Sequence, residues 1–477
     1  MSETIGEMIL PGTYIEVRAE GLIGVGGIST GNIGVVGTAN RGPLNEAVIL
    51  GSYGEALETF GSYDRWPGTA QAPALTLTRT LEQLFSGGAS TVYAVRVANL
   101  PQNTTMRTMI WTVAGEGQNN TLFTLEATSP GTWANSIQAK LTVPESGPAT
   151  LELVYGRLKE SYEGATAAEL AAGITDGSRL VKVTGLGDNK KALAPKTITA
   201  AAQDAQGGPD GAAATSTEIA AGLAVLAGKD VNIVTVGGFD AKTIAATVVA
   251  HLEATENDGR ERMAVLGVSG DAVSSIDADS AAVSNARVIL VAPGIVADDA
   301  ARVGEASKAV KLTAPYAAAL VAGRLSTLAP HISLTNKDVA ATDVTKEYTR
   351  SEQKGLLGKR VCILAKNLGI RVVKGITTDT GPFRQISVRR IVDFAKAGVR
   401  IGSNPYIGRL NNARVRAALK ATLDGFLSSM VFDEMLIGYQ LDVTATRAQE
   451  INGQAIVTMV LQPTFSIDFI KVIMNLE

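Results

Sequence analysis

Short apolar runs alternate with helical segments in two separate parts of the chain, and this alternation limits the fold more than any other feature of the sequence. The runs are rich in β-branched residues and predict strands at 32–37, 91–97, 231–236, 262–267 and 288–292. Strands that alternate with helices indicate an α/β layer built on a largely parallel sheet. We therefore expect an α/β core to which both parts of the chain contribute.

The segment between these two parts, residues 98–205, has a different character. It is rich in Thr and Ala and contains short alternating runs such as 122–127 and 149–155. Alternation with a period of two predicts half-buried strands, and the loops of a rigid sheet accept insertions at modest entropic cost. We expect a mostly β insertion that divides the core into residues 25–97 and 206–345.

Residues 346–464 form a further unit with both helical and strand patterns. The most amphipathic helix of the chain is expected at 386–400, where apolar residues recur every three or four positions. A second helix is expected at 413–426. Strands at 435–444 and 455–461 flank an Asn-Gly pair, which is a strong hairpin signal. We predict an α+β C-terminal domain.

Both ends of the chain are extended segments next to flexible joints. Residues 1–24 contain a strand pattern of period two, and residues 465–477 form a β-prone apolar run. A strand without a partner exposes a row of N–H and C=O groups, and adding it to the sheet of a neighbouring copy satisfies them. If each arm reaches a different neighbour, the contacts propagate into rings or a helical lattice. The residues predicted to pair in this way are Thr13, Ile15, Val17, Phe465, Ile467, Phe469 and Ile473, and the hinge glycines are Gly21, Gly24, Gly26 and Gly27.

The charge of the chain is divided unevenly. Its formal net charge is −3, but residues 350–477 contain 18 Lys and Arg against 10 Asp and Glu. The rest of the chain is correspondingly acidic, and such asymmetry usually reports a partner surface. We expect an acidic protein partner rather than nucleic acid, since the cations are interleaved with an apolar helical stripe and no nucleic-acid motif is present. The predicted basic row is Arg384, Arg389, Arg390, Lys396 and Arg400.

The sequence offers few side chains for catalysis. It has two histidines, His251 and His331, and one cysteine, Cys362, which lies in an apolar run and cannot form an intramolecular disulfide. Both histidines fit surface or capping positions better than the role of a general base, and we expect no GxSxG nucleophile elbow. The aspartate pairs 277/279 and 298/299 lack the spacing of a metal site. We predict no catalytic, metal-binding or cofactor-binding residues, and an α/β hydrolase-like enzyme is the alternative.

Membrane and secretion signals are not expected either. The start of the chain has neither a basic region nor a long apolar region of the kind found in a signal peptide. No apolar run reaches the roughly 18–20 residues of a membrane span. We expect a protein that is made in the cytoplasm and does not insert into membranes.

Several short motifs, in their order along the chain, resemble contractile tail sheath proteins of myophages and contractile injection systems. Pro130–Ile137 is similar to a PGxWGN segment of that family, with Ala134 in place of Gly, and Gly207–Gly211 is similar to its GGxDG turn. The series is specific because it follows the order of the family over nearly the whole chain. The other matching segments are Ile9–Glu16, Ile33–Gly37 with Arg41–Pro43, Phe85–Ala89, Val92–Val97, Val388–Phe394 and Phe465–Ile470.

The resemblance implies a structural subunit with a subtilisin-like α/β core that is not a protease. Sheath subunits form six-membered rings that stack helically around an inner tube, and the stack shortens and widens to drive the tube through a target envelope. The C-terminal domain faces the tube, the insertion projects outward, and both arms link neighbouring subunits.

The implied partners are further copies of the chain, the inner tail tube protein, and baseplate and tail terminator or cap proteins. The particle is a virion tail or an injection-system particle, assembled in the host bacterial cytoplasm. In this setting we expect the basic row to hold an acidic surface of the tube. A non-contractile structural polymer protein is the second alternative.

Overall fold

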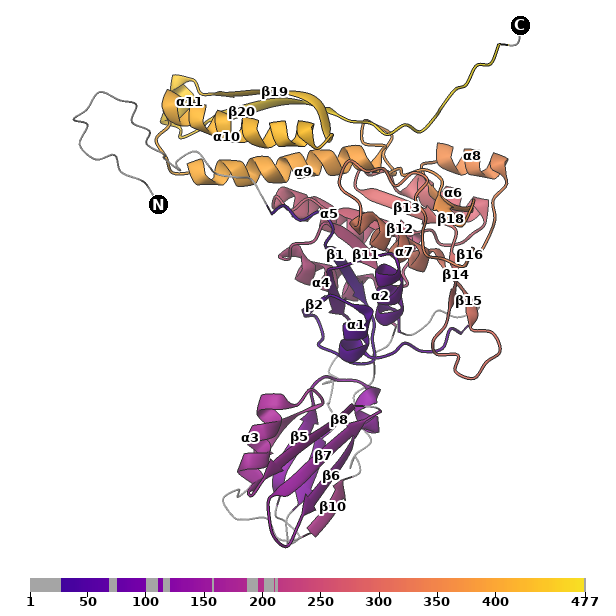
Figure 1. The fold of residues 1–477 in the computed structure, drawn as a ribbon, viewed down its shortest axis with the longest axis vertical. Coiled ribbons are helices and arrows are strands. Elements are labelled where there is room, and N and C mark those ends of the chain that lie inside the picture. Colours follow the sequence, from indigo (N-terminus) through magenta and orange to yellow (C-terminus); the bar gives the residue numbers. More distant parts are fainter. Residues whose placement is uncertain are drawn as a thin grey trace, which may run out of the picture.

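The computed structural model describes residues 27–67, 75–99, 110–114, 121–156, 158–186, 196–200, 210 and 213–475. These residues form an elongated molecule with three parts (Figure 1). A β-rich unit lies at one end, an α/β core in the middle, and a pair of long helices with a β-hairpin at the other end.

The core is built on one eight-stranded sheet with the order β18-β17-β13-β12-β11-β1-β3-β2. Strands form at all five of the apolar runs expected to be strands, and β1 pairs in parallel with both β3 and β11, so the sheet joins residues before and after the β-rich unit. The parallel strands are β1 (Ile33–Gly37), β3 (Val92–Arg96), β11 (Ile233–Val236), β12 (Met263–Gly267), β13 (Val288–Ala292) and β17 (Cys362–Lys366). The antiparallel edges are β2 (Ala47–Leu50) and β18 (Ile370–Val372).

Helices cover both faces of this sheet. The central strands are buried on both sides, as their continuous apolar sequences require. One buried cluster joins the sheet to α1 (Tyr53–Phe60), α2 (Leu77–Ser86) and α7 (Ala314–Ser326). A second joins the opposite face to α4 (Ser216–Ala227), α5 (Ala241–Asn257), α6 (Val273–Ala282) and α8 (Arg350–Gly358). The result is a three-layer α/β/α core, with a small sheet of β14 (Ile295–Asp298), β15 (Ala309–Leu312) and β16 (Asp343–Val344) beside it.

The β-rich unit has its own hydrophobic core. Alternate residues of its strands, such as Leu151 and Leu153, are buried against Leu170 of a single helix and Trp133. One sheet has the order β4-β5-β9 and the other the order β10-β6-β7-β8. The elements are β4 (Ile110–Ala114), β5 (Thr121–Ala127), the 3-10 helix η2 (Thr132–Ser136), β6 (Gln138–Val143), β7 (Ala149–Tyr155), β8 (Leu158–Gly164), α3 (Ala167–Gly177), β9 (Val181–Leu186) and β10 (Lys196–Ala200).

Two antiparallel helices and a hairpin form the third part. Gly398 permits the helices to approach closely, since a Cβ at this position would lie 1.9 Å from the ring of Phe426. The predicted hairpin is present, but its turn is longer than an Asn-Gly turn, because Thr446 and Gln449 form a capping box that begins a short helix. The elements are α9 (Ile386–Ser403), the 3-10 helix η3 (Asn404–Tyr406), α10 (Ala413–Phe432), β19 (Leu436–Thr444), α11 (Arg447–Ile451) and β20 (Ile456–Pro463).

The segment that follows β20 leaves the body of the molecule. Residues 464–475 are extended and belong to no strand of the described chain, and they run away from the hairpin toward the C-terminus (Figure 1). Within the described residues, no helix is both long and apolar enough to cross a membrane.

Candidate functional site

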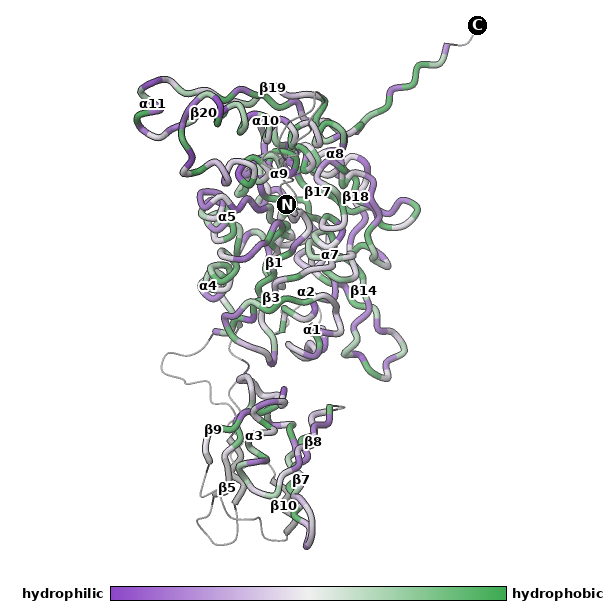
Figure 2. Tube along the Cα trace, turned by 60° about the vertical axis from the view of Figure 1, so that its left-hand side comes forward, coloured by the Kyte–Doolittle hydropathy of each residue, from purple (hydrophilic) through white to green (hydrophobic). Residues whose placement is uncertain are grey.

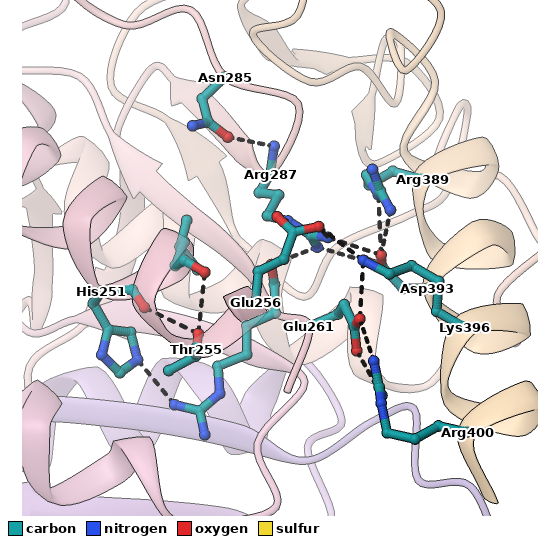
Figure 3. A network of polar contacts seen from close by, with 12 residues as sticks. His251, Thr255, Glu256, Glu261, Asn285, Arg287, Arg389, Asp393, Lys396 and Arg400 are labelled. Carbon is teal, nitrogen blue, oxygen red and sulfur yellow. Dashed lines mark hydrogen bonds and ion pairs between the residues drawn. The ribbon is translucent and has the colours of Figure 1, made fainter. Parts of the chain in front are cut away.

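The charged face of α9 lies against the core. Positions 389, 393, 396 and 400 are three or four residues apart and therefore lie on one side of the helix. Facing them are residues that precede strands of the core or end α5 (Figure 3). We refer to the whole set as the domain clasp, which consists of Glu256, Glu261, Arg287, Arg389, Asp393, Lys396 and Arg400.

Arg287 is at the centre of the domain clasp and is almost completely buried. Its guanidinium donates to both carboxylate oxygens of Glu256, at 2.6 and 2.7 Å, and to both oxygens of Asp393, at 2.7 and 3.0 Å. Arg389, one turn before Asp393, donates to the same carboxylate at 2.5 and 3.1 Å. Paired bidentate contacts of this kind are among the strongest hydrogen bonds in proteins.

Lys396 and Arg400 complete the domain clasp. The Lys396 ammonium lies 2.9 Å from a carboxylate oxygen of Glu256 and 2.9 Å from one of Glu261. Arg400 donates to both oxygens of Glu261 at 2.8 and 3.2 Å. The α9 helix is therefore fixed to the core by ion pairs along most of its charged face.

The domain clasp predicts a loss of stability in acid. Hydrogen bonds from Arg287 lower the pKa of Glu256 to about 2, although burial opposes this. Burial also acts to raise the pKa of Glu261, but hydrogen bonds from Arg400 and Lys396 outweigh it and lower this pKa to about 2. Because both values lie below the ordinary value of 4.5, the stabilisation is complete above pH 4.5 and is lost as the pH falls from there toward 2.

We expect the free energy of unfolding of the full chain to fall steeply across this pH range. The variant Glu256→Gln/Glu261→Gln is expected to be less stable at neutral pH and to lose less on acidification, since two of the groups that must be protonated are gone. Denaturant unfolding at several pH values tests this, at protein concentrations where the chain is monomeric. If the free energy of unfolding depends on pH equally in the two proteins, Glu256 and Glu261 are not the groups that cause the loss of stability in acid.

The predicted basic row does not form a free surface. Arg390 is buried and donates to the carbonyl oxygens of Thr30 and Leu328 at 3.1 and 2.9 Å, and burial lowers its pKa to about 10. Arg389, Lys396 and Arg400 are engaged in the domain clasp. Four of the five members are therefore paired within the chain, three with its carboxylates and Arg390 with backbone carbonyl oxygens. This placement does not fit the prediction that these four side chains hold an acidic tube. Arg384 is exposed and forms no ion pair with any described residue, whereas Arg400 is exposed but pairs with Glu261.

Two further cations of the C-terminal domain lack an ion-pair partner among the described residues. Arg409 and Arg414, near the turn between α9 and α10, are exposed and form no ion pair with any described residue. Arg409 lies over the ring of Tyr406 at 5.3 Å. The exposed side chains of Ile407 and Leu410 lie in the same turn.

The C-terminal arm, residues 465–475, is strongly apolar and exposed (Figure 2). Its large apolar side chains are between 60% and 84% exposed, which is unusual for one segment of a chain. They are Phe465, Ile467, Phe469, Ile470, Val472, Ile473 and Met474. All the predicted pairing residues of this arm are thus accessible, and within the described part of the chain none of them belongs to a strand.

The N-terminal predictions lie largely outside the described residues. Thr13, Ile15, Val17, Gly21, Gly24 and Gly26 all precede residue 27. Gly27 has a φ of +81°, and a Cβ there would meet nothing within 4 Å. It therefore lies in open space with a backbone conformation that favours glycine.

The hairpin of β19 and β20 has two edges without a further strand among the described residues. Its inner face packs on α10 through residues such as Tyr439 and Leu461. Its outer face carries exposed Ile437, Ile456 and Val460. A two-stranded sheet with open edges can accept an added strand from another chain.

The two sequence motifs near residues 130 and 210 meet at the joint between the core and the β-rich unit. Asp210 accepts hydrogen bonds from the backbone N–H and the hydroxyl of Thr132, at 2.9 and 2.7 Å. Gly131 has a φ of +143°, and a Cβ there would lie 2.0 Å from the carbonyl oxygen of Asn40. Arg96, fully buried, donates to the carbonyl oxygens of Gly42 and Pro130. These motifs therefore stabilise the connection between the core and the β-rich unit.

The candidate catalytic side chains are not assembled into a catalytic group. His251 contacts Arg262 at 2.9 Å, and burial together with this cation lowers its pKa to about 4. Burial raises the pKa of the Cys362 thiol to about 12. A GxSxG spacing does occur at Gly27–Gly31, contrary to expectation. It precedes β1, whereas the serine of a nucleophile elbow follows a strand. The Ser29 hydroxyl donates a hydrogen bond to Asp230 at 2.8 Å.

At the carboxyl end of β12, helix α7 covers the place where an α/β enzyme binds its ligand. Such sites lie at the carboxyl ends of the strands, and there a Cβ on Gly267 would lie 2.1 Å from the backbone of Ala314, so α7 packs directly onto the sheet. A cavity of about 530 Å³ lies at the opposite ends, between α9 and residues such as Asn232 and Met263. Among the described residues, no group of three or more His, Cys, Asp or Glu side chains is placed to hold a metal.

The chain was compared with known proteins. Residues 212–378 match the family model of the phage tail sheath protein central domain, and residues 378–477 match that of the phage tail sheath C-terminal domain. Together these matches span more than half of the 477 residues. No curated protein sequence matches the chain.

Solved structures of sheath proteins share the fold. The sheath tail protein from Desulfitobacterium hafniense is 20% identical, with a TM-score of 0.64 over 95% of this chain and 100% of that chain. The sheath tail protein from Listeria innocua is 14% identical, with a TM-score of 0.63 over 92% and 93%. The helical sheath of the anti-feeding prophage in its contracted state is 16% identical, with a TM-score of 0.55 over 99% of both chains.

Proposed function

The chain belongs to the phage tail sheath protein family, whose members are structural proteins rather than enzymes, and from this premise we propose that it polymerises into a contractile sheath. Six-membered rings of the chain stack helically around an inner tube. On triggering, the stack shortens and widens and drives the tube through a target envelope. The likeness to contracted sheaths of the anti-feeding prophage and of an extracellular contractile injection system supports this proposal.

The observation that carries the proposal is the exposed apolar C-terminal arm. Fully burying one Phe or Ile side chain contributes about 1.5–3 kcal/mol of favourable free energy. Covering the exposed arm at an interface therefore stabilises an assembly of several copies. The edges of β19 and β20, which have no further strand beside them among the described residues, are proposed as the acceptor. The arm of one copy adds a strand to the hairpin of the next, and the main-chain hydrogen bonds and buried side chains hold the two copies together.

The parts of the molecule take distinct places in this lattice. The arms, residues 1–24 and 465–477, link neighbouring copies. The divided core, predicted at 25–97 and 206–345, also includes α8, β17 and β18 and is proposed to have the subtilisin-like fold of the family. The insertion, 98–205, is proposed to project outward. Of the predicted C-terminal domain, 346–464, the part that begins at α9 lies at the opposite end of the molecule, and this part is proposed to face the tube (Figure 1).

The tube is proposed to meet cations that form no ion pair with any described residue of the chain. Arg384, Arg409 and Arg414 are exposed on the C-terminal domain, whereas the domain clasp occupies most of the α9 row. Exposed ion pairs contribute only about 0–1 kcal/mol each, so such contacts can position a tube and still release it. Baseplate and tail terminator proteins bind the ends of the stack, which is assembled in the host bacterial cytoplasm, without nucleic acid and without insertion into a membrane.

Contraction is proposed to move whole subunits. The domain clasp fixes the C-terminal domain to the core, so the two move as one rigid body. The arms keep neighbouring copies connected while the subunits rotate and separate. The lattice changes, and the contacts within each copy are kept.

Electron microscopy of the purified full chain tests the proposed function. We expect hollow, ridged tubes of uniform diameter, and a second population of wider tubes after a contraction trigger such as mild denaturant. Tubes of a single diameter under all conditions would favour a non-contractile polymer. Dispersed monomers at every concentration would contradict the sheath proposal.

A further inference from the structure

One charged residue of the C-terminal arm is buried among exposed apolar neighbours. The Asp468 side chain is only 10% exposed, whereas Ile467 and Phe469 on either side are 81% and 83% exposed. Removing a carboxylate from water is costly unless it is paired and hydrogen-bonded. The contrast shows that the arm contacts the body of the molecule at this residue.

Three residues from separate segments hold Asp468. The Lys374 ammonium, just after β18, lies 3.3 Å from one carboxylate oxygen. The amide of Gln385, which directly precedes α9, donates to the same oxygen at 3.3 Å, and the hydroxyl of Thr335 lies 3.4 Å from the other. We refer to Thr335, Lys374 and Gln385 as the arm socket. Within the arm, the Ser466 hydroxyl donates to Asp468 at 3.2 Å.

The arm socket is preformed by contacts between its own loops. The Thr335 hydroxyl accepts a hydrogen bond from the backbone N–H of Gly375 at 3.0 Å. A Cβ on Gly375 would lie 3.0 Å from the side chain of Leu334, so the two loops pack closely. The socket therefore joins the loop after α7, the loop after β18 and the start of α9.

Neighbouring arm residues reinforce the same attachment. The backbone N–H of Ser466 donates to the amide oxygen of the Gln385 side chain at 3.4 Å. The Lys374 ammonium lies 4.8 Å from the centre of the Phe469 ring. Beyond Phe469, the residues up to 475 are exposed and form no hydrogen bond or ion pair with the described body. The last contact of the arm with the described body is therefore made by Phe469, the residue after Asp468.

We propose that Asp468 is the anchor of the C-terminal arm, and that its contact with the arm socket sets the direction in which the arm leaves toward a neighbouring copy. This inference rests on the proposed function and adds the residue that positions the linking strand. An arm tied at a fixed point samples far fewer directions than one tied at the end of β20. Its effective concentration at the acceptor hairpin is therefore higher.

The first test measures the attachment itself in monomers. A fluorophore on an Ile470→Cys variant reports the motion of the arm just beyond the anchor, since Cys362 is buried and does not compete for the label. We expect Asp468→Ala to lower the fluorescence anisotropy clearly. Asp433→Asn, an exposed position at the end of α10, is the matched loss of one charge and is expected to leave the anisotropy unchanged. Equal anisotropy in all three proteins would overturn the proposal.

The second test measures polymerisation of the unlabelled chains by sedimentation. We expect Asp468→Ala to raise the critical concentration for polymerisation at least tenfold. Asp468→Asn is expected to raise it less, because the amide keeps two polar atoms that can hydrogen-bond to the arm socket. Asp433→Asn is expected to leave it within twofold of the wild-type value. A mobile arm with an unchanged critical concentration would overturn the positioning role. If the wild-type chain forms no polymer, the proposed function fails, and the anisotropy comparison still decides whether Asp468 anchors the arm.

Discussion

Removing residues 465–477 is expected to leave a folded, soluble chain that no longer polymerises. The deleted residues lie outside both buried clusters of the core and outside the hydrophobic cluster of the C-terminal domain, so the fold of the remainder is kept. After Phe469 one face of the arm is entirely apolar, with Ile470, Val472, Met474 and Leu476 at alternate positions, which is typical of a strand that packs one face against a partner. Circular dichroism checks the fold, and sedimentation or light scattering checks the size of the particles.

The size of this effect follows from the burial of the arm. Three Phe or Ile side chains that become buried contribute roughly 5–9 kcal/mol, and even about 4 kcal/mol corresponds to a change in affinity of about a thousandfold. A milder version is the pair Phe469→Ala/Ile473→Ala, compared with Lys471→Ala on the same arm. We expect the double variant to polymerise poorly and the lysine variant normally. Polymers of normal diameter and yield from the truncated chain would refute the linking role of the arm.

The second large effect is expected from Arg287→Ala, which removes the centre of the domain clasp. It leaves the carboxylates of Glu256 and Asp393 without the guanidinium that pairs them. Removing one partner from a buried ion pair typically costs about 3–5 kcal/mol. We expect a loss of this order in the free energy of unfolding, measured with denaturant. Hydrogen exchange should also become faster in α9, because the helix loses its main attachment to the core.

An exposed ion pair of the same domain supplies the control. Arg447 pairs with Glu450 at 3.1 Å, but its side chain is 84% exposed. Arg447→Ala is expected to cost no more than about 1 kcal/mol and to leave the exchange of α9 unchanged. If Arg287→Ala costs no more than this control, the domain clasp does not hold the two domains together, and contraction by rigid subunits loses its physical basis.

Local patterns predict the central layer of this molecule well. The strands of the core are continuous apolar runs between turns, and the amphipathic pattern at 386–400 predicts α9 to within three residues of its end at Ser403. The hairpin is predicted as well, although its turn contains α11, which an Asn-Gly pair alone does not indicate. These features depend on neighbouring residues in the sequence, which is why one sequence suffices to find them.

The domain clasp could not be predicted in the same way. A row of charges on a helix usually faces water, and in one sequence nothing distinguishes that from a row that faces Glu256 and Glu261, more than 120 residues away. The charge imbalance predicts an acidic partner protein, whereas the acidic groups that Arg389, Lys396 and Arg400 meet in the structure belong to the same chain. The contacts of Asp468 could not be predicted from the sequence either, because they come from three segments that only the fold brings together.

A helical reconstruction of the assembled polymer by cryo-electron microscopy tests the central claim most directly. The account predicts that residues 465–475 of each copy run as a strand along the β19–β20 hairpin of a different copy, with six copies in each ring and Asp468 still in the arm socket of its own subunit. The contradicting result is a polymer in which this arm folds back onto its own hairpin or stays free of every neighbour.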